Sequence, residues 1–133
     1  MLINHVLDEQ ELKEYSPIVL AYIGDAAFEL IVRTHLIQAG NRRIKEIHKD
    51  AVGIVKAESQ AKIVRQIYDT LSEQEKDIVR RGRNAKSHPP RNADVQQYKM
   101  STGFEALLGY LYLKGDEQRL LTLASLALEQ PEK

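Results

Sequence analysis

The chain has 133 residues, 43% of them hydrophobic, which predicts one compact domain with a core of its own. Its 19 basic and 19 acidic residues cancel, so no overall positive charge favours binding to nucleic acid. The absence of cysteine excludes a disulfide framework and a cysteine-rich zinc site.

The amino-terminal half begins without a targeting signal and continues into a long helix. Acidic residues interrupt the first segment, MLINHVLDEQELKEY, so it does not resemble a signal peptide. No apolar run is long enough to span a bilayer, and we expect a cytoplasmic protein with no membrane partner.

Ser16 and Pro17 form an N-cap and first-turn pair and Gly40 is a typical stop, which predicts a helix between them. Its residues are apolar around most of the circumference, as in a central helix surrounded by others.

The middle of the chain is also helical. Residues 41–71 carry apolar side chains at helical spacing, and Gly53 and Lys56 mark a break, which predicts two helices. Ser72 and Glu75 occupy capping-box positions and start another helix, which should end near Gly82 or a few residues later, just after position 86.

The last third contains a loop and two further helices. The two prolines of SHPPRNA exclude a helix there. From about Asp94 the pattern predicts a helix toward Lys114, and Asp116 can cap a last helix that runs through Leu128. No alternating strand pattern competes, so the predicted fold is all-α, a helical bundle in a single domain over residues 1–133.

Two acidic residues lie inside otherwise apolar helices: Asp25 in YIGDAAFEL and Glu105 in GFEALLGYLYL. An ionised carboxylate is costly to bury unless it is paired or bound to a metal. If the two helices pack side by side, both carboxylates could share a hard cation, with water filling the remaining positions as is usual for magnesium. Alternatively, each acid pairs with a basic side chain such as Arg33, or lies on a wetted helix edge. Spacing alone leaves both interpretations open.

A basic window follows the middle helices. Residues 78–93 contain no acid, and basic side chains that neutralise phosphates give sequence-independent affinity for nucleic acid. The alternative is a solvated face, which is the usual role of a run of charges. The candidate RNA-binding residues are Arg80, Arg81, Arg83, Asn84, Lys86 and Arg91.

Together, AYIGDAAFEL and STGFEALLGYLYL resemble the two signature helices of the ribonuclease III endonuclease domain. The matching positions are Gly24, Asp25, Ala26, Glu29 and Leu30 in the first, and Phe104, Glu105, Ala106, Leu107, Gly109, Tyr112 and Leu113 in the second. Larger members append a double-stranded RNA-binding domain, which we do not expect here. The chain therefore resembles the compact Mini-III branch, and RGRNAK resembles the basic segment of that branch.

Departures from the larger enzymes reduce the set of acids. Those enzymes carry glutamates at the positions of Ile18 and Ala21 and an aspartate at the position of Thr102. The Mini-III branch shares this reduced set, so the losses favour membership of the branch. Because magnesium readily keeps several waters, two carboxylates for each site can suffice. Whether one or two ions bind, and whether the lost acids lower activity, stays open.

The resemblance implies a metal-dependent endoribonuclease that cleaves double-stranded RNA. Asp25 and Glu105 would be catalytic and would hold Mg²⁺, with Mn²⁺ as a substitute, and no side-chain nucleophile would be needed. Glu29 and Thr102 are candidates for supporting contacts around the pair, although for Glu29 we favour an ordinary salt bridge. The resemblance also implies a homodimer whose two sites face one duplex. In this branch the substrate is the precursor of large-subunit (23S) ribosomal RNA, processed with help from a large-subunit ribosomal protein.

Two other functions fit parts of the sequence. A catalytically inactive, dimeric double-stranded RNA-binding module would bind the duplex without metal-dependent turnover. A helical interaction protein would show no salt-sensitive affinity for RNA. The presence of both Asp25 and Glu105 favours the enzyme over either.

Overall fold

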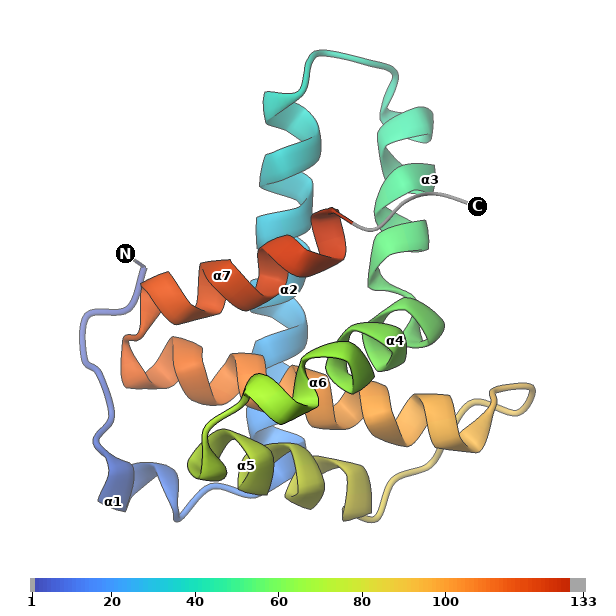
Figure 1. Cartoon of the computed structure of the whole chain (residues 1–133). Helices are drawn as coiled ribbons and strands as arrows, with labels where there is room; N and C mark the ends of the chain where they lie inside the picture. Colours follow the sequence, from blue (N-terminus) through green and yellow to red (C-terminus); the bar gives the residue numbers. More distant parts are fainter. Residues whose placement is uncertain (1, 130–133) are drawn as a thin grey trace.

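The computed structural model describes residues 2–129, and all the regular secondary structure in that range is helical (Figure 1). Residues 1 and 130–133, the ends of the predicted domain, lie outside the described residues. The helices are α1 (Glu9–Leu12), α2 (Pro17–Gln38), α3 (Ile44–Val55), α4 (Ala57–Ile67), a 3₁₀ turn (Tyr68–Thr70), α5 (Glu73–Asn84), α6 (Val95–Lys114) and α7 (Glu117–Leu128). The predicted all-α class is confirmed. No described helix combines the length and the hydrophobicity needed to cross a membrane.

Local capping chemistry sets most helix boundaries where the sequence predicts them. The Ser16 hydroxyl accepts a hydrogen bond from the backbone N–H of Val19 and begins α2. The predicted capping box of Ser72 and Glu75 is formed, with bonds of 2.9 and 3.1 Å in the two directions. Asp94 and Asp116 cap α6 and α7 through the same kind of side-chain contact. Helix α6 ends at Gly115, whose φ of 84° lies in the left-handed region that glycine adopts without strain.

Two local features differ from the expectation. Helix α1 was not predicted, although Asp8 and Glu11 form a complete capping box around it. The break between α3 and α4 falls at Lys56, whose extended backbone ends one helix and begins the next, while Gly53 stays inside α3. A glycine within a helix weakens it without having to interrupt it.

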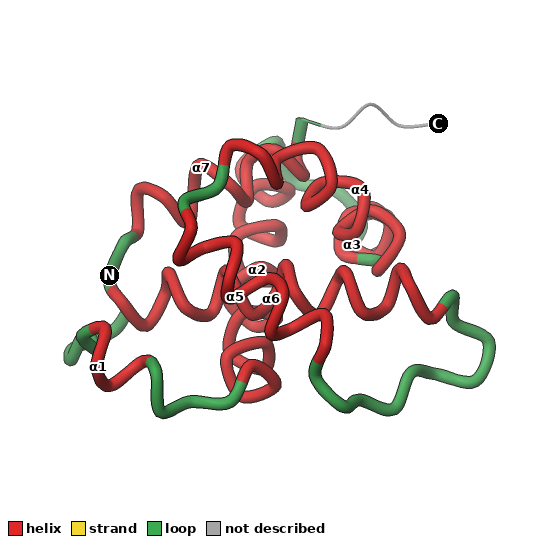
Figure 2. The backbone as a smooth tube through the Cα atoms, turned by 60° about the horizontal axis from the view of Figure 1, so that its bottom comes forward, coloured by secondary structure: helices red, strands yellow, loops and turns green. Residues whose placement is uncertain are grey.

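Helix α6 forms the centre of the molecule, and α2 and α5 cross it closely (Figures 1 and 2). A Cβ atom on Gly24 would lie 1.8 Å from the backbone oxygen of Glu105, and one on Gly109 would lie 1.8 Å from the backbone oxygen of Leu20. The backbones of α2 and α6 therefore touch at this crossing. Beside it, the rings of Phe28 and Phe104 pack edge to face with centroids 5.5 Å apart.

Helix α2 is not surrounded as its composition suggested. One face is buried against α6, but the opposite face carries large apolar side chains that are open to solvent: Ile18 (41% exposed), Val19 (50%), Tyr22 (82%) and Leu30 (50%). We call these four residues the α2 stripe. Ile18 and Val19 lie four and three residues before Tyr22, and Leu30 follows about two turns later on the same side of the helix. An apolar composition all round a helix indicates burial on all sides, but here the described chain leaves Ile18, Val19 and Tyr22 open to solvent, and α7 lies near Leu30 only across a cavity.

Two polar contacts brace the periphery. Arg119 of α7 donates two hydrogen bonds of 2.9 Å to the carboxylate of Glu75, which is 7% exposed, and so ties α7 to the start of α5. Burial alone would raise the pKa of Glu75, but these bonds and those from Ser72 outweigh it and hold the pKa below its usual value. On α6, Tyr110 donates a hydrogen bond of 2.5 Å to Glu9 and so anchors α1.

Candidate metal and RNA-binding site

The crossing of α2 and α6 brings Asp25 and Glu105 together. Asp25 follows Gly24 directly, and the backbone oxygen that Gly24 approaches belongs to Glu105 itself. The two carboxyl groups are close enough to form a hydrogen bond with each other. The glycine of the first motif thus has a physical role, because any larger residue would separate the two helices that carry the acids.

The two carboxyl groups have different environments. Asp25 lies on the open side of α2 and is exposed, contrary to the expectation that its helix is covered all round, whereas Glu105 is half-buried. Burial, and then the negative charge of Asp25, raise the pKa of Glu105 to about 8, with a smaller contribution from Glu29. A cluster of carboxylates that repel one another in this way provides a favourable position for a cation.

The two predicted supporting residues lie in different surroundings. Glu29 forms an i,i+4 salt bridge with Arg33, with 3.2 Å between Nε and Oε2, and its charge still reaches Glu105. Thr102 is buried, and its hydroxyl donates a hydrogen bond of 3.0 Å to the backbone oxygen of Tyr98. Its hydroxyl is therefore used within its own helix. Ala21 is 7% exposed, and Ile18 belongs to the α2 stripe.

Sequence reasoning missed one neighbour of Glu105. Gln60 of α4 is 1% exposed, and its Nε2 donates to the backbone oxygen of Val55 at 3.0 Å and to Oε2 of Glu105 at 3.4 Å. A signal was present, because Gln60 lies three and four residues before Ile63 and Val64 on the apolar face of α4. An amide in such a position needs buried partners.

The basic window occupies the end of α5 and the loop that leads to α6. Arg80 donates a hydrogen bond to the hydroxyl of Tyr68, and Arg81 donates one of 3.5 Å to the backbone oxygen of Tyr15, so these neighbours point to different sides of α5. Arg83 is half-buried and donates to the side chain of Asn84. Lys86 and Arg91 are exposed on the loop, which extends beyond the bundle at the amino-terminal end of α6 (Figure 2).

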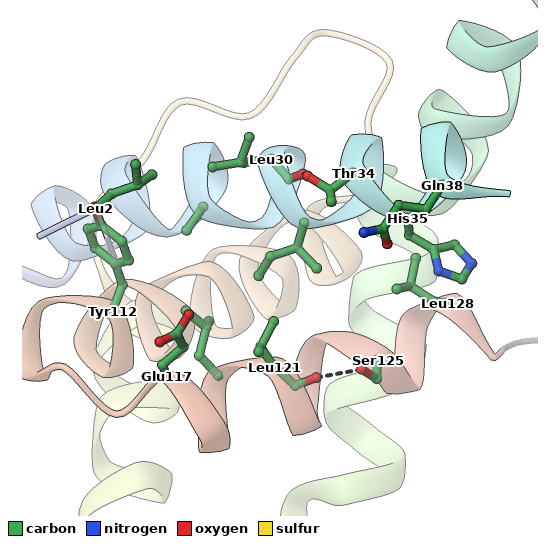
Figure 3. A pocket seen from close by; sticks show the side chains of 13 residues that line it. Leu2, Leu30, Thr34, His35, Gln38, Tyr112, Glu117, Leu121, Ser125 and Leu128 are labelled. Carbon is green, nitrogen blue, oxygen red and sulfur yellow. Dashed lines mark hydrogen bonds between the residues drawn. The ribbon is translucent and has the colours of Figure 1, made fainter. Parts of the chain in front are cut away.

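A separate apolar cavity of about 390 Å³ lies between α2 and α7 (Figure 3). Leu30, Leu121 and Leu128 line it together with His35 and Glu117, and neither Asp25 nor Glu105 does. The carboxylate pair therefore lies on an open surface outside this cavity. An open surface suits a long, rigid substrate better than a small molecule, which proteins usually enclose.

The described residues supply two carboxylates, Asp25 and Glu105, as ligands for a metal ion. Water can reach the exposed Asp25 and supply the other ligands. Between residues 2 and 129, no group of three or more His, Cys, Asp or Glu side chains is placed to hold a metal ion. The donors at the crossing are carboxylate oxygens, which suit the hard cations that keep several waters. Asp25 and Glu105 thus fit a hydrated divalent cation better than a fully protein-bound one.

Comparison with known proteins identifies the family. A model of the ribonuclease III domain matches residues 18–116. This chain belongs to the ribonuclease III family. It is 48% identical to Mini-ribonuclease 3 of Thermoanaerobacter sp. (strain X514), over 98% of this chain and 92% of that protein, and 47% identical to Mini-ribonuclease 3 of Symbiobacterium thermophilum, over 88% and 91%. A crystal structure of a protein from Fusobacterium nucleatum matches with a TM-score of 0.81 at 32% identity, over 89% of this chain and 95% of that one.

Membership of the ribonuclease III family confirms the predicted family and its Mini-III branch. It also confirms the predicted class of enzyme, an endoribonuclease of that family. The matched range includes Asp25, Glu105 and the whole basic window. The fold of the Fusobacterium nucleatum protein extends over nearly all of the chain, so the α2–α6 crossing lies within the shared architecture.

Proposed function

We propose that this protein is a divalent-metal-dependent endoribonuclease that cleaves double-stranded RNA with Asp25 and Glu105 as its metal-binding and catalytic pair. The observation that carries the proposal is the backbone contact of α2 with α6 at Gly24, which brings Glu105 beside the exposed Asp25, whose charge helps to raise the pKa of Glu105. Two carboxylates that repel one another destabilise the folded protein when no cation is present. A bound cation balances their charge and removes this cost. The family membership supports the same chemistry. We place the whole catalytic unit in one domain, residues 1–133, and the protein in the cytoplasm.

The chain's own residues would do three things at this site. Asp25 and Glu105 hold the ion, Mg²⁺ or Mn²⁺ in its place, and Glu29 adds negative potential while bonded to Arg33. When bound, such an ion polarises a phosphate oxygen and lowers the pKa of a water molecule that can attack phosphorus. No serine, cysteine or histidine nucleophile is then required. The α2–α6 crossing keeps the two carboxylates at a fixed separation, which lowers the cost of organising the site.

We further propose that the enzyme works as a homodimer joined through the α2 stripe. Four large apolar side chains exposed along one helix face are unusual for a monomer and typical of an interface. Tyr22, the most exposed of them, precedes Asp25 by one turn, so a two-fold axis here would bring a second carboxylate pair to the same face. Two such pairs could cut both strands of one duplex.

The proposed dimer predicts that a charged residue on the α2 stripe weakens self-association. Replacing Tyr22 with lysine should weaken self-association about 30-fold or more, because losing a central aromatic anchor costs about 2 kcal/mol or more. Ile44→Lys is the matched control, since Ile44 is 78% exposed on α3 and lies off the stripe. Sedimentation velocity over a range of concentrations distinguishes the two. Equal self-association of both variants would show that the stripe is not the interface.

The substrate we propose is the precursor of large-subunit (23S) ribosomal RNA, with a large-subunit ribosomal protein as accessory partner. A-form RNA presents its phosphates and 2′-hydroxyls across a shallow groove, and a protein with little net charge can read this shape through a local basic segment. The exposed loop residues Lys86 and Arg91, with Arg80, Arg81, Arg83 and Asn84 beside them, would supply the phosphate contacts.

The loop predicts a measurable salt dependence. Exchanging Lys86 and Arg91 for glutamine together should weaken duplex binding and reduce the slope of log K against log salt by about 0.9 for each phosphate that is no longer neutralised. Lys13 and Lys45, exposed and outside the window, provide a control pair with the same change of charge. Filter binding at several salt concentrations measures the slope. An unchanged slope in the loop variant would remove the loop from the RNA interface.

The decisive experiment is cleavage of a long double-stranded RNA by the purified protein. We expect cutting with Mg²⁺, none after treatment with EDTA, and none by an Asp25→Asn variant that folds normally by circular dichroism. Duplex binding by the wild-type protein without any metal-dependent cutting would instead identify the inactive, dimeric RNA-binding module. Neither binding nor cutting would favour a helical protein-interaction domain.

A further inference from the structure

Gln60 has an unusual environment for a side chain in a core. It is 1% exposed, and within residues 2–129 its Oε1 is the one buried side-chain nitrogen or oxygen atom without a hydrogen-bond partner. Its Nε2, by contrast, has two acceptors, the backbone oxygen of Val55 and Oε2 of Glu105. The donors are fully used and the acceptor is not.

These contacts fix the orientation of the amide. A terminal amide nitrogen carries two hydrogens, and here each is directed at an oxygen. Turning the amide over would place Oε1 against the carbonyl of Val55, which is an acceptor, and against the carboxylate of Glu105, which is also an acceptor in the ionised form that binds a metal. The observed orientation is therefore the only one that gives Glu105 a donor from α4.

Packing alone does not explain an amide at this position. Leaving a buried acceptor unpaired costs about 1 to 3 kcal/mol, whereas a methionine or leucine would fill similar space without that cost. The stabilising contribution of Gln60 must therefore come from its donor side. One of its two bonds ends on the helix α3 terminus and the other on the carboxylate of the candidate site.

We propose that Gln60 is a positioning residue that fixes the carboxylate of Glu105 in its metal-binding orientation. The inference rests on the proposed function, because it assigns Glu105 to the metal. Val55 anchors the amide at 3.0 Å, and the amide in turn restrains Oε2 of Glu105 at 3.4 Å, which leaves Oε1 of Glu105 free of this contact. Partners behind a ligating carboxylate typically change metal affinity or activity by about 10- to 100-fold when removed.

The test compares Gln60→Met with Gln118→Met, an exposed glutamine on α7 that serves as the matched control. We expect the dissociation constant for Mn²⁺, titrated by calorimetry without RNA, to rise by about 10- to 100-fold in Gln60→Met only. The turnover rate should fall by a similar factor at limiting Mg²⁺ and recover in excess Mg²⁺, while KM for the duplex stays unchanged. The melting temperature of the metal-free variant should stay the same or rise. A residue with a purely structural role would not produce metal rescue.

Two results would overturn the inference. If Gln60→Met binds Mn²⁺ as tightly as wild type, Gln60 does not position the ligand. Should that variant fail to fold, Gln60→Leu also removes the N–H donors without adding a polar group, and wild-type turnover at limiting Mg²⁺ in this variant would have the same meaning. A wild-type protein that binds no metal would overturn the proposed function as well, so the two failures are distinguishable.

Discussion

Replacing Glu105 with glutamine should abolish RNA cleavage and at the same time stabilise the metal-free protein. Loss of one of the two proposed metal ligands is expected to reduce turnover by about three orders of magnitude, equivalent to about 4 kcal/mol of barrier. The stabilisation follows from the neighbours of Glu105. Asp25 and Glu29 on α2 repel its negative charge. Among the side chains that shift its pKa, only Gln60 on α4 donates a hydrogen bond to its carboxylate. An amide removes the repulsion and keeps the shape.

The sign of the pH dependence follows from the direction of the shift. The pKa of Glu105 is raised to about 8 in the folded protein from an ordinary value of 4.5, so the folded state holds this proton more tightly than the unfolded chain. The contribution of Glu105 to stability is thus full below pH 4.5 and is lost as the pH rises toward 8. Glu105→Gln should therefore match wild type near pH 4.5 and exceed it at pH 8 by on the order of 4 kcal/mol, since the shift from 4.5 to about 8 covers several pKa units and each corresponds to about 1.4 kcal/mol.

Urea denaturation in EDTA at the two pH values, with cleavage assays at pH 7.5 on the same preparations, checks both halves of this prediction. Glu29→Gln is the matched control, because it makes the same chemical change one turn from Asp25 on a residue that is bonded to Arg33. We expect it to retain most of the activity. A Glu105→Gln variant less stable than wild type at pH 8 would contradict the charge repulsion described here.

Replacing Gly24 with alanine should unfold the protein or destabilise it by more than about 4 kcal/mol. The new Cβ would lie 1.8 Å from the backbone oxygen of Glu105 and 2.7 Å from the backbone nitrogen of Gly109. Real atoms do not approach so closely, and the obstacle is backbone that no rotamer change can move aside. Relief requires α2 and α6 to separate along their whole contact, which would loosen the centre of the core.

Gly53→Ala provides a matched control for this prediction. Gly53 lies inside α3, and a Cβ built there meets nothing within 4 Å. The same substitution should stabilise the protein by about 0.5 to 1 kcal/mol, because alanine is the better helix former. Thermal unfolding followed by circular dichroism measures both variants. A Gly24→Ala protein with wild-type stability would show that the helices do not touch at this point.

The parts of the fold that depend on neighbours in sequence were predictable from sequence. Ser16, Ser72 and Asp116 each form a cap through a backbone group three residues away, so their signals are complete within a few residues. The capping box of Asp8 and Glu11 carried the same signal, but its helix is only four residues long. The pairing of Asp25 with Glu105 required the family resemblance, because 80 residues of chain separate them and no local pattern encodes that contact.

The exposure and the orientation of individual side chains could not be predicted in the same way. The apolar residues of α2 suggested burial on all sides, yet Tyr22 is 82% exposed, since composition does not reveal which side the remaining helices leave open. Arg80 and Arg81 looked equivalent in a run of basic residues, whereas adjacent positions on a helix point in different directions and contact Tyr68 and Tyr15. The role of Gln60 depends on atoms contributed by three helices, which only the folded arrangement brings together.

The contact of backbone with backbone at Gly24 and Gly109 also limits how the enzyme can move. Helices separated by side chains can slide past one another by small rotamer changes, but here Gly24 and Gly109 leave no side chain between the two backbones. Helices α2 and α6 should therefore behave as one rigid body throughout a catalytic cycle. Any adjustment to RNA, such as opening to admit a duplex or releasing the cut ends, must come from outside this pair of helices, for example from the 85–94 loop or, in the proposed dimer, from relative motion of its two subunits.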